Sequence, residues 1–374
     1  MPSLSQSLIR VHHQGAIADK LLCQWRGQLP AFVCVLGFTH TGLIDHISAA
    51  GLTSRDRQFT AIADGEFLAT GQTYTVPLPP LTQGVSPALI TRAILTGLNL
   101  RPYIANAGLP MTPPIPECLN LGGMPAQCLT TGKALPLAIV HHIFQSAYQW
   151  GKTLRTNYAY VTIGECVVGG TTTALAVLQA LGISAHGKVG SSHRICNHDQ
   201  KWHIVQQGLA QLPPHPDPWS IVSVVGDPMQ IAVAGLTLAI AQHKGVLLAG
   251  GSQMVAVYAL ARSIAGATGL PWHKENILIG TTKWATNDSS SGLVQLAQLV
   301  DAPLVSSQFS LANSQYPQLR SYEAGYVKEG VGAGAVCILA HLYANWDQAQ
   351  MLALIEALLA KMEYKMDNIS TIYS

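Results

Sequence analysis

One pattern recurs three times in the second half of the chain: an apolar segment, a turn rich in glycine and other small residues, and an apolar helical segment. It is found at YAYVTIG before GECVVGGTTTALAVLQALG, at KGVLLAG before GSQMVAVYALARSIAG and, with a shorter lead-in, at GYVKEGVGAGAVCILAHLYA. Short strands that alternate with helices are typical of α/β architecture. Strands that are apolar almost throughout indicate a parallel sheet covered by helices on both faces. The pattern therefore predicts an α/β fold built on a mostly parallel sheet.

Apolar runs bounded by turn signals place further elements along the chain. Strands are predicted at residues 31–39 and 58–66, helices at 86–98 and 136–154, and another strand–turn–helix unit at 221–242. Residues 182–187 resemble a short strand, and residues 345–366 have the periodicity of a packing helix. Glycine and proline crowd residues 108–136, which predicts a long loop, and such loops often cover functional sites.

Length and composition limit the class of protein. The chain has 374 residues and 48% hydrophobic content, enough for a large core, and we expect a single domain over residues 1–374. Only 11% of the residues are charged, which favours a buried subunit interface over a free monomer. The net charge of +2 is spread along the chain, so the sequence has no electrostatic footprint for nucleic acid or an anionic membrane.

Cysteine usage and the distribution of apolar residues indicate a cytoplasmic protein. The seven cysteines are widely spaced and form no C-x-x-C pair, as expected of free thiols in a reducing compartment. The segment 1–15 has no basic stretch followed by an apolar run, so we expect no secretory signal. The uncharged run 228–242 is too short to span a bilayer, and polar residues and glycines interrupt residues 245–261. Buried elements are therefore preferred to membrane spans.

The segment GECVVGGTTTA, residues 164–174, is the most informative candidate for a binding site. A strand is expected to end at Ile163, after which the glycines let backbone N–H groups approach a ligand. A helix that begins at the threonines would attract phosphate through its free N–H groups and its dipole. The candidate phosphate-binding residues are Gly169, Gly170, Thr171, Thr172 and Thr173. A tight turn with a threonine cap explains the same residues without any ligand, and the segment matches neither a Walker A loop nor G-x-G-x-x-G.

Two glutamates in glycine-rich turns are candidates for acid–base chemistry. Glu165 fits a catalytic or ribose-binding group and, equally, a residue that orients its own loop. Glu329 lies in KEGVGAG before an apolar helix, where desolvation would raise its pKa as a general base requires. A solvated charge beside a helix start is the alternative for Glu329. Gly330 and Gly332 of the same turn are candidate substrate-binding residues.

Three other segments are weaker candidates. Gly250, Gly251 and Ser252, followed by Gln253, repeat the strand–turn–helix pattern, and capping is the preferred role of Ser252. The loop HGKVGSSHR either forms a basic surface or supplies phosphate contacts, the candidates being Lys188, Gly190, Ser191, Ser192 and Arg194. Asp227, before a proline, fits a helix-start turn and a ribose ligand about equally. The 14 histidines show no metal-ligand spacing, and G-x-S-x-G is absent, so we expect no metal site, no bound cofactor and no hydrolase of that type.

In combination, the segments GECVVGGTTTALAVLQALG, GDPMQIAVAGLTLAIA with GVLLAGGSQMVAVYALA, and VKEGVGAGAV resemble the nicotinate-nucleotide:dimethylbenzimidazole phosphoribosyltransferase family. The resemblance spans about residues 160–340, with the best-matching core at 155–340, and is that of a divergent branch. Gly170 stands where that family has Asn, Lys328 where it has Gly, and Ala249 where it has Asp. The family's N-terminal K-P-P-G-S-L-G motif is missing. The fold that the resemblance implies is a doubly wound parallel sheet with a smaller helical part, as a homodimer.

The resemblance also implies roles for particular residues. The family's catalytic base falls on Glu329, its second active-site glutamate on Glu165, and its phosphate-binding turn on residues 169–172; Lys188 to Ser191 look like its V-G-R-G-[ST]-G stretch. The implied reaction transfers phosphoribose from nicotinate mononucleotide to an aromatic base, dimethylbenzimidazole-like or adenine, and gives an α-ribotide for the cobalamin lower ligand. Nicotinate leaves as a neutral pyridine, so one base suffices and no metal is required. The alternative is a non-catalytic nucleotide-binding protein that keeps the phosphate-binding turn.

Overall fold

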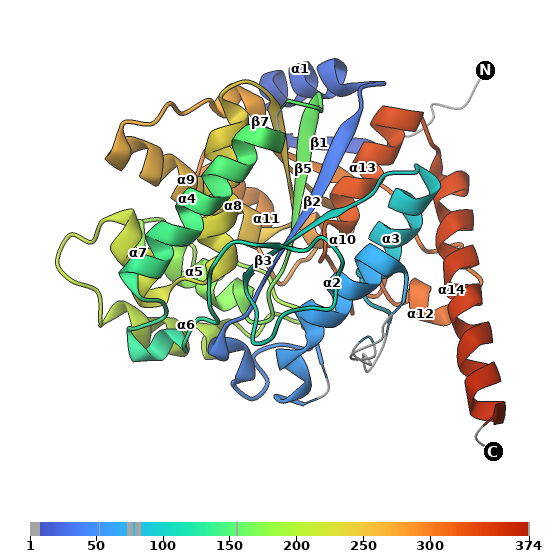
Figure 1. Cartoon of the computed structure of the whole chain (residues 1–374), viewed down its shortest axis with the longest axis horizontal. Helices are drawn as coiled ribbons and strands as arrows, with labels where there is room; N and C mark the ends of the chain where they lie inside the picture. The colour runs from blue at the N-terminus through green and yellow to red at the C-terminus, as the bar shows by residue number, and fades with distance from the viewer. Residues whose placement is uncertain (1–7, 52, 73–77, 79–83, 155, 373–374) are drawn as a thin grey trace.

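The computed structural model describes residues 8–372 apart from 52, 73–77, 79–83 and 155, and is organised around one eight-stranded sheet (Figure 1). The strand order is β1-β8-β7-β6-β5-β2-β3-β4. The strands are β1 (Ile9–His13), β2 (Pro30–Gly37), β3 (Tyr103–Gly108), β4 (Leu119–Asn120), β5 (Tyr160–Cys166), β6 (Gly245–Ala249), β7 (Ile277–Thr282) and β8 (Leu304–Ser307). Of these described strands, only β1 runs antiparallel to its neighbour; the other pairs are parallel. The predicted fold class, a mostly parallel α/β sheet, is confirmed.

Helices cover both faces of the sheet (Figure 1). One layer contains α4 (Leu137–Leu154), α5 (Gly170–Ala180), α6 (His198–Leu209), α7 (Pro218–Val225), α8 (Pro228–Ala241), α9 (Ser252–Thr268) and α11 (Leu293–Leu299). The other contains α1 (Gly15–Trp25), α2 (Thr60–Thr70), α3 (Ala88–Gly97), α13 (Ala333–Ala344) and α14 (Gln348–Ile372), while α10 (Lys283–Thr286) and α12 (Pro317–Arg320) are single turns. Among the described residues, none of the helices has both the length and the uniform apolarity that crossing a bilayer requires.

The central strand β2 explains why the strand sequences are apolar almost throughout. Ala31, Val33 and Val35 pack into the hydrophobic cluster under α4 and α8, whereas Phe32 and Leu36 pack into the cluster under α2, α3 and α13. Because successive side chains of a strand point to opposite faces, a strand buried on both faces needs an apolar residue at every position.

Strand order reverses between β2 and β5, and this determines where a ligand can bind. From β2 the chain moves outward to β3 and β4, then returns to pair β5 with the other side of β2 before continuing to β6, β7 and β8. The connections therefore leave β2 and β5 in opposite directions. In open α/β sheets such a switch point leaves a crevice at the carboxyl ends of the strands.

Two predicted strands are helices. Residues 58–66 lie mostly in α2, whose residues from Thr60 to Leu68 are all buried, so the helix lacks the polar face that marks helical periodicity. Residues 221–225 belong to α7, where Asp217 accepts a hydrogen bond from the Ser220 N–H and Pro218 starts the helix. This cap and first-turn proline are a helix-start signal that outweighs the strand propensity of the isoleucine and valines.

Three smaller expectations are also wrong. Strand β5 continues past Ile163 to Cys166, because Gly164, Glu165 and Cys166 keep pairing with β2. Residues 182–187 form turns and no strand. The loop 108–136 does not cover the cavity described below; it runs along the end of β2, where the Ala126 N–H bonds the Phe38 carbonyl and the His40 N–H bonds that of Ala126. The predicted last helix is found as α14, which packs against α3.

Candidate active site

A cavity of about 370 Å³ lies at the carboxyl edge of the sheet, where the strand order reverses. Its walls come from segments that follow β2, β5, β6 and β7, together with α2, the loop before α6 and the turn before α13. The volume is within the range of small-molecule sites. The cavity gathers most of the residues singled out from sequence: Glu165, Gly169, Gly170, Thr171, Gly190, Ser191, Gly251, Ser252, Glu329 and Gly330.

The turn between β5 and α5 brings backbone to the cavity wall. Gly169 has φ +85°, and an added Cβ would lie 2.7 Å from the backbone of Gly42, so both the conformation and the close approach require glycine. Within the described part of the chain, no side chain caps α5. The N–H groups of Gly170, Thr172 and Thr173 bond the backbone carbonyls of Val167 and Gly169, so this turn offers an anion the positive end of the helix dipole and the partly exposed Thr171.

The three threonines of α5 separate into different environments. Thr171 is partly exposed and lines the cavity. Thr173 is fully buried and its hydroxyl bonds the Asp227 carboxylate at 2.6 Å, while Thr172 is buried and its hydroxyl has no partner in the described part of the chain. Asp227 also caps α8 through a capping box with Gln230. The structure thus directs only Thr171 toward a ligand, and Asp227 acts in the core.

Glu165, near the end of β5, is a buried carboxyl group with one side-chain partner. Gln253 at the start of α9 donates an amide hydrogen bond to its Oε1 at 2.9 Å, and Oε2 has no partner among the described residues. Burial raises the pKa of Glu165 to about 8, and the nearby carboxylates of Asp227 and Glu329 add to the rise. Glu165 is therefore mostly protonated at neutral pH, and a proton on its buried Oε2 meets no acceptor among the described residues.

Glu329 is held by four donors. The Thr281 hydroxyl and the Thr282 N–H bond its Oε2, both at 2.8 Å, and the Gly330 and Gly334 N–H groups bond its Oε1 at 3.1 and 3.2 Å. Gly334 approaches the end of β7 so closely that an added Cβ would lie 2.1 Å from the Thr281 carbonyl carbon. Burial raises the pKa of Glu329, and the four hydrogen bonds oppose the rise. The carboxyl group is fixed in position and partly exposed to the cavity.

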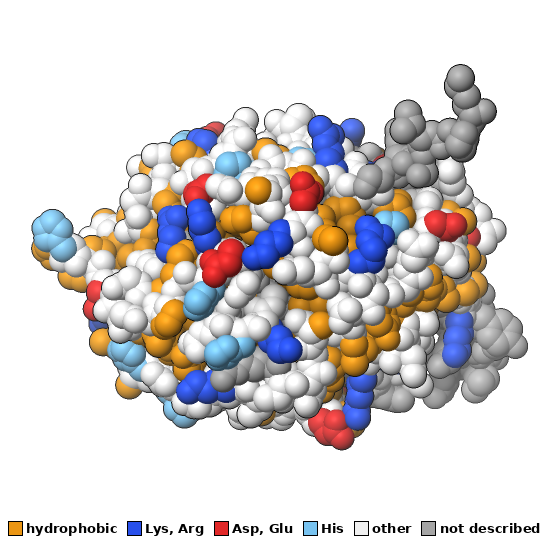
Figure 2. All heavy atoms as spheres, turned by 90° about the horizontal axis from the view of Figure 1, so that it is seen from above, with side chains coloured by type: hydrophobic (Ala, Val, Ile, Leu, Met, Phe, Trp, Pro, Cys, Tyr) orange, Lys and Arg blue, Asp and Glu red, His pale blue; other side chains and the backbone are white. Residues whose placement is uncertain are grey.

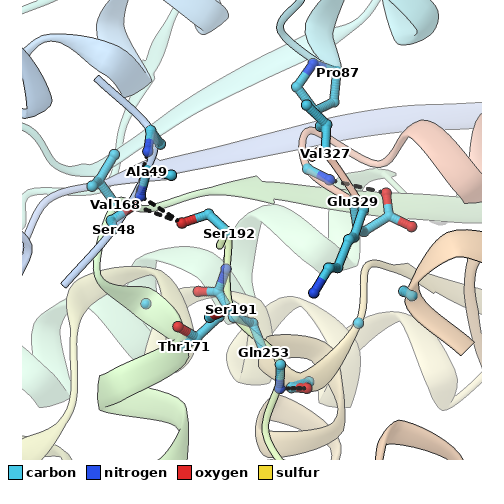
Figure 3. A pocket seen from close by; sticks show the side chains of 18 of the residues that line it. Ser48, Ala49, Pro87, Val168, Thr171, Ser191, Ser192, Gln253, Val327 and Glu329 are labelled. Atoms are coloured by element: carbon cyan, nitrogen blue, oxygen red, sulfur yellow. Dashed lines mark hydrogen bonds between the residues drawn. The ribbon is translucent and has the colours of Figure 1, made fainter. Parts of the chain in front are cut away.

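The loop between α5 and α6 forms another wall and is anchored at two neighbouring points, Gly190 and Ser192. The Ser252 hydroxyl accepts the Gly190 N–H at 3.0 Å, so Ser252 holds this loop and is the first residue of α9, not its cap. The Ser192 hydroxyl bonds the Ser48 hydroxyl at 3.0 Å and accepts the Ala49 N–H at 2.8 Å (Figure 3). Hydroxyl groups and glycine backbone therefore dominate this side of the cavity.

Lys201 of α6 fixes the same loop from behind. Its side chain is fully buried and donates to the Val189 carbonyl at 2.9 Å and the Gly190 carbonyl at 2.7 Å. Desolvation lowers the pKa of Lys201 to about 8. In the sequence, Lys201 shares a helical face with Ile204, Val205 and Gly208. This pattern indicates a buried lysine, although no role was predicted for Lys201 from the sequence.

A buried ion pair joins the turn before α13 to the neighbouring loops. The Lys328 ammonium lies 2.6 Å from the Asp288 carboxylate and 3.2 Å from the Arg194 carbonyl. Both side chains of the pair are less than a tenth exposed. Burial alone would raise the pKa of Asp288, but the hydrogen bond and charge of Lys328 lower it overall. Lys328 thus ties together three separate segments of the cavity wall.

Several predicted site residues lie behind the cavity wall. The side chain of Lys188 packs against Gly292, the Gly250 N–H bonds the Gly280 carbonyl, and Gly332 caps α13 with φ +78°. Other lining residues lie in segments from which no site was predicted: Ser48, Ala49, Thr60, Asp64, Pro87 and Asp288. Within the described residues, no three histidine, cysteine or acidic side chains lie close enough together to hold a metal ion.

Comparisons with known proteins agree with the motif resemblance. Residues 121–270 match the family model described as Phosphoribosyltransferase. A UPF0284 protein of Cyanothece sp. is 55% identical over 355 residues, 94% of this chain and 96% of the relative. A UPF0284 protein of Nostoc sp. is 49% identical over 376 residues, 93% and 98% of the two chains.

A solved structure has the same fold. The nicotinate-nucleotide-dimethylbenzimidazole phosphoribosyltransferase from Thermus thermophilus superposes with a TM-score of 0.61 over 90% of this chain and 88% of that chain, at 17% identity. The fold likeness includes most of the N-terminal region in which the motif comparison found no counterpart. The resemblance to the nicotinate-nucleotide:dimethylbenzimidazole phosphoribosyltransferase family that the motifs indicated is confirmed. The relatives are UPF0284 proteins, and the identity to the solved enzyme is low, so the likeness is that of a divergent branch.

Proposed function

The chain belongs to the UPF0284 family, and from its match to the phosphoribosyltransferase family model over residues 121–270 and from the cavity at the switch point we propose that it transfers phosphoribose from nicotinate mononucleotide to an aromatic base. The products are nicotinate and an α-ribotide of the base, a precursor of the cobalamin lower ligand. The observation that carries the proposal is the meeting of Glu165, Glu329 and the uncapped α5 N-terminus around one cavity of nucleotide size. Simple binding of a nucleotide would not require two carboxyl groups in the cavity.

The 5′-phosphate fits the side of the cavity that consists of hydroxyl groups and glycine backbone. There Thr171, Ser191 and Ser192 offer neutral hydroxyl donors beside the positive end of the α5 dipole. A phosphate bound at this side would fix the ribose between the two glutamates, and holding two reactants in place contributes much of the rate of such a reaction. The aromatic rings then occupy the opposite side, near Glu329 and Pro87 (Figure 3).

The transfer proceeds as a substitution at the anomeric carbon. A ring nitrogen of the base forms a bond to C1′, the C1′–N bond to the pyridinium breaks, and its electron pair stays on the pyridine nitrogen of the departing nicotinate. The N–H proton of the base passes to the Glu329 carboxylate, which later releases it to solvent. Glu165, protonated at neutral pH, donates a hydrogen bond to the substrate. Attack opposite the leaving group inverts C1′ and gives the α configuration.

Nicotinate release tests the proposal. Purified protein is incubated with nicotinate mononucleotide, with and without dimethylbenzimidazole or adenine, beside the Glu329→Gln variant. We expect release that depends on the base and is lost in the variant. Binding of the mononucleotide without release under any of these conditions would contradict the proposal and identify a nucleotide-binding protein instead.

We also infer that the chain acts in the cytoplasm as a homodimer. The low content of charged residues, 11%, supports a covered surface. On the face seen from above Figure 1, acidic and basic side chains are interspersed and apolar side chains form a band between them (Figure 2). Light scattering coupled to gel filtration should give twice the chain mass of 39.8 kDa, and the mass of one chain would contradict the dimer.

A further inference from the structure

Asp64 is a buried carboxylate in the cavity wall to which neither the motifs nor the proposed reaction assigns a role. It lies in α2, is 4% exposed and lines the cavity. It accepts hydrogen bonds from the Ser86 hydroxyl at 2.6 Å and the Cys166 thiol at 3.4 Å. In the described part of the chain, no lysine, arginine or histidine forms an ion pair with it.

The side of the cavity around Asp64 differs from the phosphate side. Its other lining groups are largely apolar, including Pro87, Val327 and Val331. Figure 3 shows Pro87, Val327 and Glu329 together on one side, while Ser48 and Ser192 lie across the cavity. Gly330 brings the turn before α13 close to Pro87, since an added Cβ would lie 3.1 Å from its ring. This contact joins the turn and Pro87 into one apolar wall, against which the face of a flat heterocycle could pack.

The bonding of Asp64 is incomplete for a carboxylate. A carboxylate offers about four acceptor positions, and a thiol is a weak donor. Glu329, in the same wall, has four donors, two of them on each oxygen. A carboxylate that faces a cavity with so few partners is costly unless a ligand supplies a donor. The ligand group that fits is an N–H or amino group on the edge of a ring packed against this wall.

We propose that Asp64 is a specificity-determining residue that accepts a hydrogen bond from an amino group of the acceptor base. The acceptor class is therefore an aminopurine rather than a benzimidazole whose edge carries only methyl groups. The inference rests on the proposed phosphoribosyl transfer and names its acceptor. The two carboxyl groups then have different roles. Glu329 accepts the ring proton, and Asp64 determines which base is bound.

Selectivity measured within each variant tests this role. With saturating nicotinate mononucleotide, kcat/KM is determined for adenine, unsubstituted purine, the 6-oxopurine hypoxanthine and dimethylbenzimidazole in the full-length protein, Asp64→Asn and Asp64→Ala. We expect the unmodified protein to prefer adenine over purine by about 10- to 100-fold, the range for one hydrogen bond to a charged group. Asp64→Ala should lose this preference, and Asp64→Asn, whose amide can donate, should shift it toward the 6-oxopurine. Because each value is a ratio within one variant, partial unfolding cancels.

A matched control is Asp56→Asn, which changes a nearby aspartate that bonds Thr53 outside the cavity and should leave the ratio unchanged. A preference for dimethylbenzimidazole in the unmodified protein, or an adenine preference that survives in Asp64→Ala, would overturn the inference. If no base supports nicotinate release, the proposed function fails. Equilibrium binding of adenine and purine to the same variants then still decides on Asp64, since equal affinities overturn its role and an Asp64-dependent preference supports it.

Discussion

The end of β5 and the turn before α13 each present a glutamate to the same cavity but hold it in different ways. Glu165 receives one side-chain hydrogen bond, and burial raises its pKa to about 8. Glu329 receives four hydrogen bonds, three of them from backbone N–H groups. Both carboxyl groups lie beside glycines at the carboxyl edge of the sheet. The number of backbone N–H donors around each carboxyl group therefore decides which glutamate is stabilised as an anion. Only the anion can accept a proton.

Exchanging each glutamate for glutamine tests this difference most directly. Glu329→Gln should lower kcat by about 10²- to 10⁴-fold, the usual contribution of a general base. Glu165→Gln keeps a hydrogen-bond donor in the cavity and should cost about tenfold or less. Steady-state release of nicotinate measures both. A larger loss in Glu165→Gln would reverse the assignment of the base.

The second turn has a buried ion pair that the first turn lacks. Removing one partner of such a pair leaves an unpaired buried charge, so Lys328→Met should lower the free energy of unfolding by about 3 kcal/mol or more. Lys133 is exposed, and Lys133→Met should change it by less than about 0.5 kcal/mol. Urea unfolding of both variants gives the values. Equal stabilities would show that the Lys328–Asp288 pair does not stabilise the turn.

Glu329 receives a hydrogen bond from a hydroxyl group, that of Thr281, whereas the side-chain donor to Glu165 is the Gln253 amide. The Thr281 hydroxyl is the only one of the four Glu329 donors that can reverse and accept a hydrogen bond once Glu329 is protonated. Thr281→Val should therefore lower kcat by about tenfold with little change in KM, as expected for one hydrogen bond to a charged group. Thr281→Ser keeps the hydroxyl and is the control. An unchanged kcat in the valine variant would show that the reversal does not matter.

The raised pKa of Glu165 predicts a pH dependence of stability. Between the unfolded pKa near 4.3 and the folded pKa of about 8, the folded chain binds a proton that the unfolded chain has lost. Stability therefore falls as pH rises through this range. Glu165→Gln removes the difference, so its melting temperature should depend less on pH between about 6 and 8. Calorimetric melting curves that run parallel for the two proteins would contradict the raised pKa.

The backbone of the site was predictable because it follows from the repeated pattern. Strands β5 and β6 and the helices after them are recognisable as apolar runs with glycine turns, and the carboxyl ends of parallel strands must meet at one edge. This places Glu165, Gly169 and Ser252 in one cavity. The fold class followed from the same pattern.

The side-chain directions were less predictable. Thr171, Thr172 and Thr173 are equivalent in sequence, but packing of α5 on the core turns two of them away from the cavity. Asp64 lies in a helix that is buried on all sides and was predicted as a strand, so its position relative to the cavity could not be inferred. Asp288 lies in a loop without any pattern, and its role depends on Lys328, which is distant in sequence.

The pairing of β1 with β8 has a consequence for synthesis of the chain. Ile9 pairs with Ser307, about 300 residues later, and this antiparallel pair forms one edge of the sheet. On the ribosome, β1 must stay unpaired until nearly the whole chain has emerged, and β2 likewise lacks its partner β5 until residue 166 has been made. Strand β2 is apolar, and an apolar strand with a free hydrogen-bonding edge is prone to aggregate. Completion of this sheet is thus a late event, and chaperone binding to the nascent chain would protect the strands that wait for it.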